Sequence, residues 1–207
     1  MEMKSSLGVR LGLFVLGAGL VAGTGCAGGS PSKFYTLSAI PVTAETKIGK
    51  DAGGKPLVIG LGPVHLPYYL ARKEIVTRTD AHRVDVAQNE FWGGSLQDDF
   101  SRTLLENLTF LLAEDRITLN PWPGGSRGDY RVSVDVLRFD GTRGGEIVLL
   151  TKWVVRNGSD NKEMRSRNVR IRETIKDQSY EALVEGMSRA VAGLSREIGN
   201  DIKTLPR

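Results

Sequence analysis

The single cysteine of the chain, Cys26, directly follows an apolar segment and carries the clearest chemical signal. Lys4 and Arg10 supply a basic start, residues 11–22 (LGLFVLGAGLVA) are apolar or glycine, and residues 23–25 are small. A basic region, an apolar region of about 7–15 residues and small residues before the cut define a secretory signal peptide. A cysteine at the cut predicts lipoprotein processing, in which the Cys26 thiol is joined to diacylglycerol and becomes the new N-terminus.

Two other interpretations of Cys26 stay open at this point. The motif for lipoprotein processing usually has an aliphatic residue three positions before the cysteine, where this chain has Gly23. Because of this departure, Cys26 could instead be an incidental residue in an ordinary cleaved signal, or part of an uncleaved anchor. The apolar run is shorter than the roughly 20 residues of a spanning helix. We predict a signal peptide over 1–25, lipid attachment at Cys26 and a flexible Gly/Ser/Pro-containing tether over 26–32.

Residue patterns for catalysis or metal binding are weak. His65 lies between two prolines, His82 begins a predicted strand, and neither has a partner at metal-ligand spacing. Ser188 lies in GMSRA, in mid-helix, and lacks the second glycine of a nucleophile elbow. Gly60 and Gly62 precede Pro63, which removes an amide that a phosphate loop needs. We therefore expect no enzyme activity, no cofactor and no metal.

Charge and cysteine content agree with an exported protein. The chain has 28 basic and 24 acidic residues, a net charge of +4, and loses one positive charge on removal of residues 1–25. This mild excess does not favour nucleic acid as a partner. Acylation of Cys26 would block the lone thiol in an oxidising periplasm. Ala27 is not the aspartate that retains lipoproteins at the inner membrane, which favours the outer membrane of a Gram-negative organism.

Four aromatic residues are candidates for an interaction surface. Tyr68, Tyr69 and Trp92 lie beside prolines or glycines near predicted loops, and Trp122 lies between Pro121 and Pro123. The alternative for these aromatic residues is core packing at strand ends, and for Trp92 core packing is the favoured interpretation. Trp122 is hard to bury in a loop of this composition, so an exposed binding role competes evenly with packing.

The elements that position these residues follow from hydrophobic periodicity. The spacing of three and four from Leu96 to Leu111 predicts one helix, capped by Ser95, and the spacing from Tyr180 to Ile202 predicts a second, capped by Asp177 or Ser179. Asp140-Gly141 is interpreted as a turn and Asn157-Gly158 as the start of a loop. Alternation or apolar runs predict strands at 34–37, 57–64, 74–78, 82–87, 117–119, 130–136, 147–155 and 169–175.

This pattern predicts a single α+β domain over 33–207, with a mainly antiparallel sheet packed against two amphipathic helices. Both helices are expected on the same face of the sheet. No internal repeat or second domain is visible in the sequence.

The chain also resembles the PqiC/YmbA lipoprotein family, the auxiliary components of MCE-type ABC transport systems. LPYYLAR (66–72) and EIVTR (74–78) match a family signature, and the resemblance is most specific over 67–78. Phe91 and Gly93-Gly94 depart from the basic residue and the Ala-Glu usual there. The other matching segments are KFYTL (33–37), FWGGSL (91–96), LLENL (104–108), VDV with FD (134–140), Trp153 and YEALV (180–184).

The resemblance implies an accessory lipoprotein without catalytic activity, anchored in the outer membrane and facing the periplasm. Its partners would be an MCE-domain transport protein, phospholipid and further copies of the same chain. A structural lipoprotein that braces the outer membrane without handling lipid is the alternative from a different class. A periplasmic hydrolase would need a nucleophile and a base that the sequence does not offer.

Overall fold

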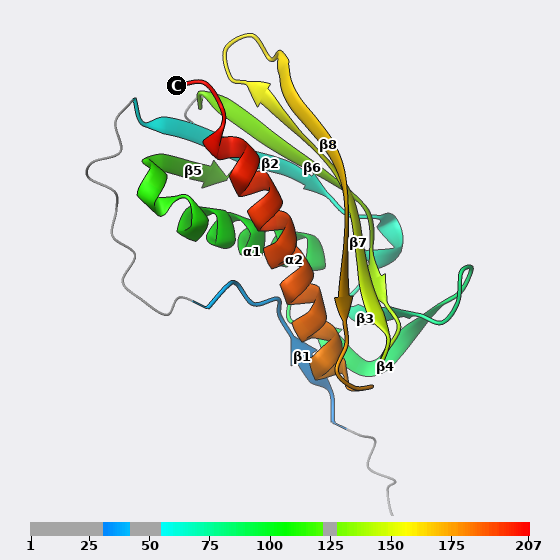
Figure 1. Ribbon diagram of the computed structural model, residues 1–207. Coiled ribbons are helices and arrows are strands. Elements are labelled where there is room, and N and C mark those ends of the chain that lie inside the picture. The colour runs from blue at the N-terminus through cyan, green and yellow to red at the C-terminus, as the bar shows by residue number, and fades with distance from the viewer. Residues whose placement is uncertain (1–30, 42–54, 122–127) are drawn as a thin grey trace, which may run out of the picture. The chain divides into compact units, whose positions relative to one another are not determined.

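The computed structural model describes residues 31–41, 55–121 and 128–207. Its larger sheet contains five strands in the order β5-β2-β6-β7-β8 (Figure 1). The strands are β2 (Leu57–His65), β5 (Ile117–Pro121), β6 (Tyr130–Gly141), β7 (Glu146–Asn157) and β8 (Glu163–Thr174). β7 lies between β6 and β8 and has buried residues on both faces, as its apolar sequence predicts.

The smaller sheet has the order β1-β4-β3 and is made of β1 (Lys33–Tyr35), β3 (Glu74–Arg78) and β4 (Val84–Trp92). β3 and β4 form an antiparallel hairpin, and β4 is longer than the strand predicted at 82–87. A 3-10 helix, η1 (Tyr68–Leu70), connects β2 to β3.

Pairing within the sheets is mixed. β2 is parallel to both β5 and β6, and β1 is parallel to β4, so three of the six pairings among the described residues are parallel. Parallel strands are usually buried on both faces, and six of the nine residues of β2 are buried. The single α+β domain is confirmed, with more parallel pairing than the sequence indicates.

Both predicted helices are present, and both begin at predicted caps. α1 (Leu96–Leu111) begins after Ser95, whose Oγ accepts from the Asp98 amide at 3.3 Å. α2 (Tyr180–Lys203) begins after Ser179, which accepts from the Ala182 amide at 3.1 Å. A serine cap satisfies one of the free amides of the first turn and contributes about 1 kcal/mol. A short 3-10 helix, η2 (Ala113–Asp115), follows α1.

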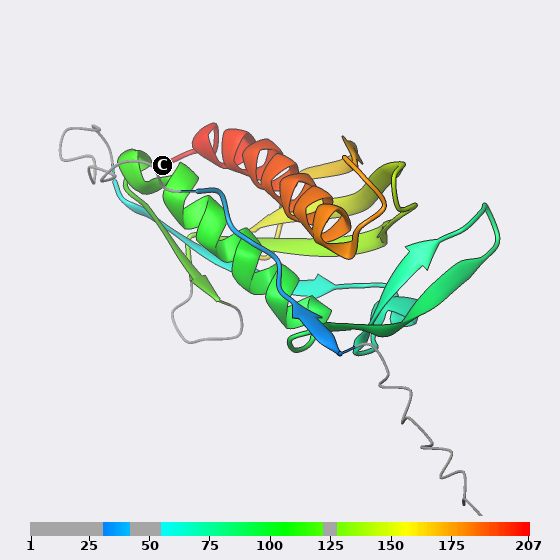
Figure 2. The ribbon, with the colours of Figure 1, turned by 90° about the horizontal axis from the view of Figure 1, so that it is seen from below.

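The helices form one layer against the larger sheet (Figure 2). α1 packs on β2 and β5, α2 packs on β7 and β8, and the two helices contact each other. The buried stripe of α1 contains Leu96, Phe100, Leu104 and Leu108, and Phe100 meets Phe139 of β6 edge to face at 5.3 Å. The prediction that both helices lie on the same face is therefore confirmed. None of the helices in the described residues is long and apolar enough to cross a membrane.

The segment after β1 is attached to the helices by backbone hydrogen bonds to side chains. The Leu37 amide donates to Asp99 of α1 at 2.5 Å, and the Ile40 amide donates to Asn107 of α1 at 2.7 Å. The Ser38 amide donates to Ser188 of α2 at 3.1 Å. Residues 37–40 are therefore bound to both helices.

Two local predictions need correction. Asp140-Gly141 is not a turn, because β6 continues through Gly141, which pairs with Ile147 of β7. A Cβ at Gly141 would lie 2.4 Å from the Glu146 carbonyl oxygen, so the glycine permits close strand approach. The strand predicted at 117–119 is longer than expected, because β5 also includes Asn120 and Pro121.

Candidate functional site

The structure places the predicted site residues in different environments. Cys26 and Trp122 lie outside the described residues. The Tyr68 side chain is exposed, at 93% of its surface, whereas Tyr69 beside it is half-buried. Trp92, at the end of β4, is only 5% exposed. Tyr68, Tyr69 and Trp92 therefore do not form one continuous exposed aromatic surface.

Tyr69 instead belongs to a buried polar cluster around Asp140, which has no exposed side-chain surface. Its hydroxyl donates to Asp140 Oδ2 at 2.6 Å. Arg78 binds the same carboxylate with two groups, Nε to Oδ1 at 2.9 Å and Nη2 to Oδ2 at 2.8 Å. Arg138 Nε adds a fourth hydrogen bond, to Oδ1 at 2.8 Å. We call Tyr69, Arg78, Arg138 and Asp140 the Asp140 cluster.

The Asp140 cluster joins elements that are separate in sequence. Tyr69 comes from η1, Arg78 from the end of β3, and Arg138 and Asp140 from β6. The cluster therefore fixes η1 and the hairpin to the larger sheet. Two-point binding of a carboxylate by arginine is a strong and directional contact.

The electrostatics of the Asp140 cluster favour the charged pair. Burial alone would raise the pKa of Asp140, but hydrogen bonds from Arg78, Tyr69 and Arg138 outweigh it, so this pKa lies below its ordinary value. Burial and the hydrogen bond to Asp140 raise the pKa of Tyr69 to about 12. The hydrogen bond to Asp140 also raises the pKa of Arg78. At neutral pH the cluster is a stable ion pair with a neutral phenol, and it has no group poised to exchange a proton.

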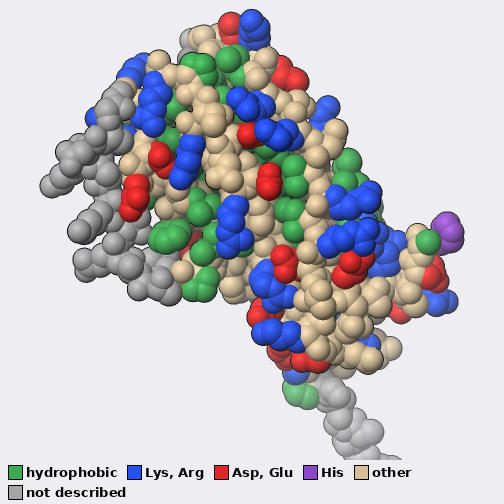
Figure 3. Space-filling view, viewed as in Figure 1, with side chains coloured by type: hydrophobic (Ala, Val, Ile, Leu, Met, Phe, Trp, Pro, Cys, Tyr) green, Lys and Arg blue, Asp and Glu red, His purple; other side chains and the backbone are tan. Residues whose placement is uncertain are grey.

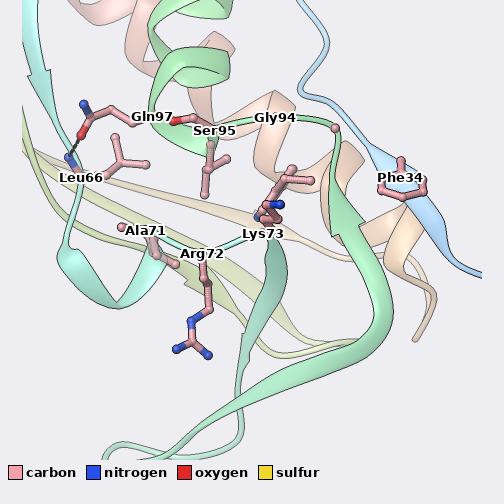
Figure 4. A pocket seen from close by; sticks show the side chains of 12 residues that line it. Phe34, Leu66, Ala71, Arg72, Lys73, Gly94, Ser95 and Gln97 are labelled. Atoms are coloured by element: carbon pink, nitrogen blue, oxygen red, sulfur yellow. Dashed lines mark hydrogen bonds between the residues drawn. The ribbon is translucent and has the colours of Figure 1, made fainter.

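A cleft of about 640 Å³ lies beside the Asp140 cluster, between η1, the end of β4 and the start of α1 (Figure 4). Figure 4 shows Leu66 and Gln97 at one end of the cleft and Phe34 at the other. Ala71, Arg72 and Lys73 lie along the side opposite Ser95. The described residues that line the cleft are Phe34, Leu66, Leu70, Ala71, Arg72, Lys73, Trp92, Gly93, Gly94, Ser95, Leu96 and Gln97.

The cleft combines an apolar interior with a cationic rim. Leu70, Trp92 and Leu96 are buried beneath it. Arg72 and Lys73 are exposed, and within the part of the chain that the structure describes neither side chain has a carboxylate partner. Ligand sites commonly pair apolar walls with a few polar groups and have volumes of about 300–1,000 Å³. The cleft is therefore the best candidate for a binding site.

Phe34 extends the apolar surface of the cleft toward the N-terminal segment. It is 69% exposed and stacks on Phe91 of β4, with ring centroids 5.7 Å apart. The β1–β4 pairing aligns these two residues. The cleft thus lies directly beside the point where the chain enters the domain.

The groups considered for catalysis have structural surroundings. Ser188 Oγ donates to the Val184 carbonyl oxygen at 2.9 Å and accepts from the Ser38 amide. His65 and His82 are both exposed, at the end of β2 and in the loop of the β3–β4 hairpin. Among the described residues no cluster of three or more His, Cys, Asp or Glu side chains is placed to hold a metal ion.

β8 carries a row of four arginines, Arg165, Arg167, Arg170 and Arg172, and three of them contact acidic residues. Arg165 and Arg167 both contact Asp201 of α2, at 3.6 and 2.5 Å, and Arg172 contacts Glu146 of β7 at 2.5 Å. In Figure 3 the basic side chains are interspersed with acidic ones and do not form a field of a single sign. The row is thus chiefly an ion-pair network with neighbouring elements.

Sequence reasoning did not single out Arg78, Arg138, Asp140 or the rim cations Arg72 and Lys73. All but Arg138 lie in segments on which the family resemblance rests. That resemblance was the feature of the sequence that could have indicated them. Their convergence depends on the docking of the hairpin against β6. Spacing along the chain does not encode that docking.

Comparison with known proteins identifies the family. Residues 35–199 match the model of the ABC-type transport auxiliary lipoprotein component family. The chain belongs to this family, and the matched region runs from β1 into α2.

Named relatives agree with this assignment, and solved structures share the fold. The chain is 24% identical over 182 residues to the intermembrane transport lipoprotein PqiC of Escherichia coli, covering 88% of this chain and 92% of that protein, and it matches PqiC of Shigella flexneri equally. A crystal structure of an uncharacterized protein covers 83% of this chain and 99% of its own, at a TM-score of 0.68 and 20% identity. Protein XCC0632 from Xanthomonas campestris gives a TM-score of 0.63 at 13% identity, covering 80% and 92%. These structures share the fold.

Proposed function

We propose that this protein is an accessory lipoprotein of an MCE-type ABC transport system that supports phospholipid transport between membranes. In this proposal it is anchored in the outer membrane by lipidated Cys26, faces the periplasm and catalyses no reaction. The observation that carries the proposal is the family match over residues 35–199. The similarity to PqiC, whose name describes intermembrane transport, supports the lipid-transport role.

The N-terminal sequence supports the anchoring. A basic start, an apolar run and a cysteine after small residues precede the domain. Several acyl chains on one residue hold a protein stably at a membrane, whereas one chain binds reversibly. The domain begins at β1, seven residues after Cys26, so an anchored domain would stay close to the leaflet.

The anchoring is tested by fractionation of cells that express the native chain or Cys26→Ser. We expect the native protein in the outer-membrane fraction, labelled by palmitate, and the variant unlabelled and released from that fraction. A variant that remains membrane-bound with the mass of the native protein would contradict lipid anchoring.

The partnership is tested by mild crosslinking and purification of the acylated protein from its own cells. We expect an MCE-domain protein to co-purify, and we expect crosslinked multiples of the chain if it assembles as a homo-oligomer. If deletion changes outer-membrane permeability while lipid composition and lipid traffic stay unaffected, the structural brace is the favoured function. Turnover of a substrate by the purified chain would contradict the non-catalytic role.

A further inference from the structure

We propose that the cleft between η1, β4 and α1 binds one acyl chain of an anionic phospholipid from the bilayer to which the protein is tethered. The phospholipid would act as a second attachment point that orients the domain on the membrane surface. This inference rests on the membrane tethering proposed above. It concerns a lipid of the supporting leaflet and makes no claim about the molecule that is transported.

The shape and lining of the cleft fit an acyl chain. Leu66, Leu70, Trp92 and Leu96 provide apolar surface, and the volume of about 640 Å³ lies within the range of about 300–1,000 Å³ typical of ligand sites. A Cβ built on Gly94, which also lines the cleft, meets no atom within 4 Å, so the space above it is open. Burial of an apolar chain here removes hydrocarbon from water on both partners.

The charges of the cleft fit an anionic head group. Within the described part of the chain, its lining contains Arg72 and Lys73 and has no Asp or Glu. Figure 4 shows the Arg72 guanidinium extending away from Ser95 and α1, and this side chain is exposed. A single cation near an anionic membrane surface contributes about 1 kcal/mol, or roughly fivefold in affinity. Both cations are free to meet a phosphate, because the described residues give neither a carboxylate partner.

The position of the cleft brings it near the membrane. Phe34 lines it and lies eight residues after Cys26, so the acylated residue is at most about 29 Å away along an extended chain. Phe34 is also exposed, and the apolar side chains of segments that lie in the membrane interface are commonly Trp, Phe and Leu. The tether thus keeps the mouth of the cleft within reach of the leaflet.

The test measures quenching of tryptophan fluorescence by phospholipids with brominated acyl chains. The acylated full-length protein is used in the Trp122→Phe background, which leaves Trp92 in the cleft and the fully buried Trp153. We expect vesicles with brominated phosphatidylglycerol to quench the emission more strongly than vesicles with equally brominated phosphatidylcholine. Further replacement Trp92→Phe should remove the quenched component. Equal quenching by both lipids, or quenching that survives loss of Trp92, would overturn the proposal.

Charge-reversal variants with a matched control distinguish lipid binding by Arg72 and Lys73 from general attraction of the protein surface to the membrane. In the double variant Arg72→Glu with Lys73→Glu, the affinity for phosphatidylglycerol vesicles, measured by the quenching, should fall by at least about 20-fold. Each cation contributes about fivefold to this affinity. Lys152→Glu with Arg170→Glu makes the same change in charge at exposed positions on β7 and β8 and should leave quenching unchanged. Equal losses in the two double variants would show general surface attraction and would overturn the site.

A large side chain placed in the cleft tests whether an acyl chain binds there. Gly94→Phe should abolish quenching without disturbing the core, because its side chain enters open space, and Gly94→Ala should retain it. If Gly94→Phe spares quenching but prevents co-purification of the MCE-domain partner, the cleft docks a protein and the proposal is wrong. If quenching fails in every form while Cys26 is acylated and the partner co-purifies, only this inference fails. If Cys26 proves unacylated, the tethering fails independently of the quenching result.

Discussion

Arg78 and the pair Arg72–Lys73 lie within seven residues of one another, yet they have opposite environments. Arg78 is mostly buried and binds Asp140 with two groups, whereas Arg72 and Lys73 are exposed on the rim of a cleft. All three lie in or between the segments LPYYLAR and EIVTR. A single sequence motif therefore contains residues that hold the fold together and residues that are free to bind a ligand.

The largest expected effect is at Arg78. Arg78→Met leaves the buried Asp140 carboxylate with Arg138 as its only cation in the Asp140 cluster, and removal of one partner of a buried pair costs about 3–5 kcal/mol. We expect the free energy of unfolding, measured by urea titration, to fall by about 3 kcal/mol. Arg72→Met is the matched control and should leave it nearly unchanged. Similar losses of stability in both variants would contradict the proposed difference between Arg78 and Arg72.

The tyrosine pair offers a second comparison. Tyr69→Phe removes a hydrogen bond to a buried carboxylate, worth about 1.5–3 kcal/mol for a charged acceptor. Tyr68→Phe changes a residue that is 93% exposed and should have little effect on thermal unfolding. A larger loss in Tyr68→Phe than in Tyr69→Phe would show that the Asp140 cluster contributes little to stability.

The Asp140 cluster also predicts a dependence on pH. Because the pKa of Asp140 is lowered in the folded protein, its contribution is present above the ordinary value of 3.8 and is lost as the pH falls through the lowered value. We expect urea midpoints below about pH 4 to fall more steeply for the native protein than for Asp140→Asn. Asp135→Asn, at an exposed position of β6, should follow the native profile. Parallel profiles for all three proteins would contradict the role of Asp140.

The smallest expected effect on stability is at the rim of the cleft. Arg72→Ala with Lys73→Ala should change the free energy of unfolding by less than about 0.5 kcal/mol, as is usual for exposed positions without special contacts. The same variant should weaken quenching by brominated phosphatidylglycerol. This separation of stability from binding is the sharpest test of the comparison. A large loss of stability would indicate that the rim cations have a structural role.

Hydrophobic periodicity was sufficient to predict the helices and most of the strands. Leu96, Phe100, Leu104 and Leu108 lie on one buried face of α1, as their spacing predicts, and Ser95 and Ser179 cap the helices. These features depend on residues that are close in sequence. Their physical causes are local, and the sequence shows them directly.

Strand pairing and the Asp140 cluster depend on distant residues and were not predictable in the same way. Asp140-Gly141 has the composition of a turn, but β7 pairs with this dipeptide and Arg78 neutralises its carboxylate. The parallel pairing of β2 with β5 and β6 likewise depends on the path of the chain through α1. The interaction-surface prediction for Trp122 stays a prediction, because this residue lies outside the described residues.

The bonds between residues 33–40 and the helices have a mechanical consequence. Any pull on the N-terminal segment first reaches β1, where Lys33 and Tyr35 contact Glu181 at the start of α2. Beyond it, the backbone of residues 37–40 is held by side chains of both helices. Force on the N-terminal segment would thus be shared between the helical layer, through these hydrogen bonds, and the three-stranded sheet, through the pairing of β1 with β4.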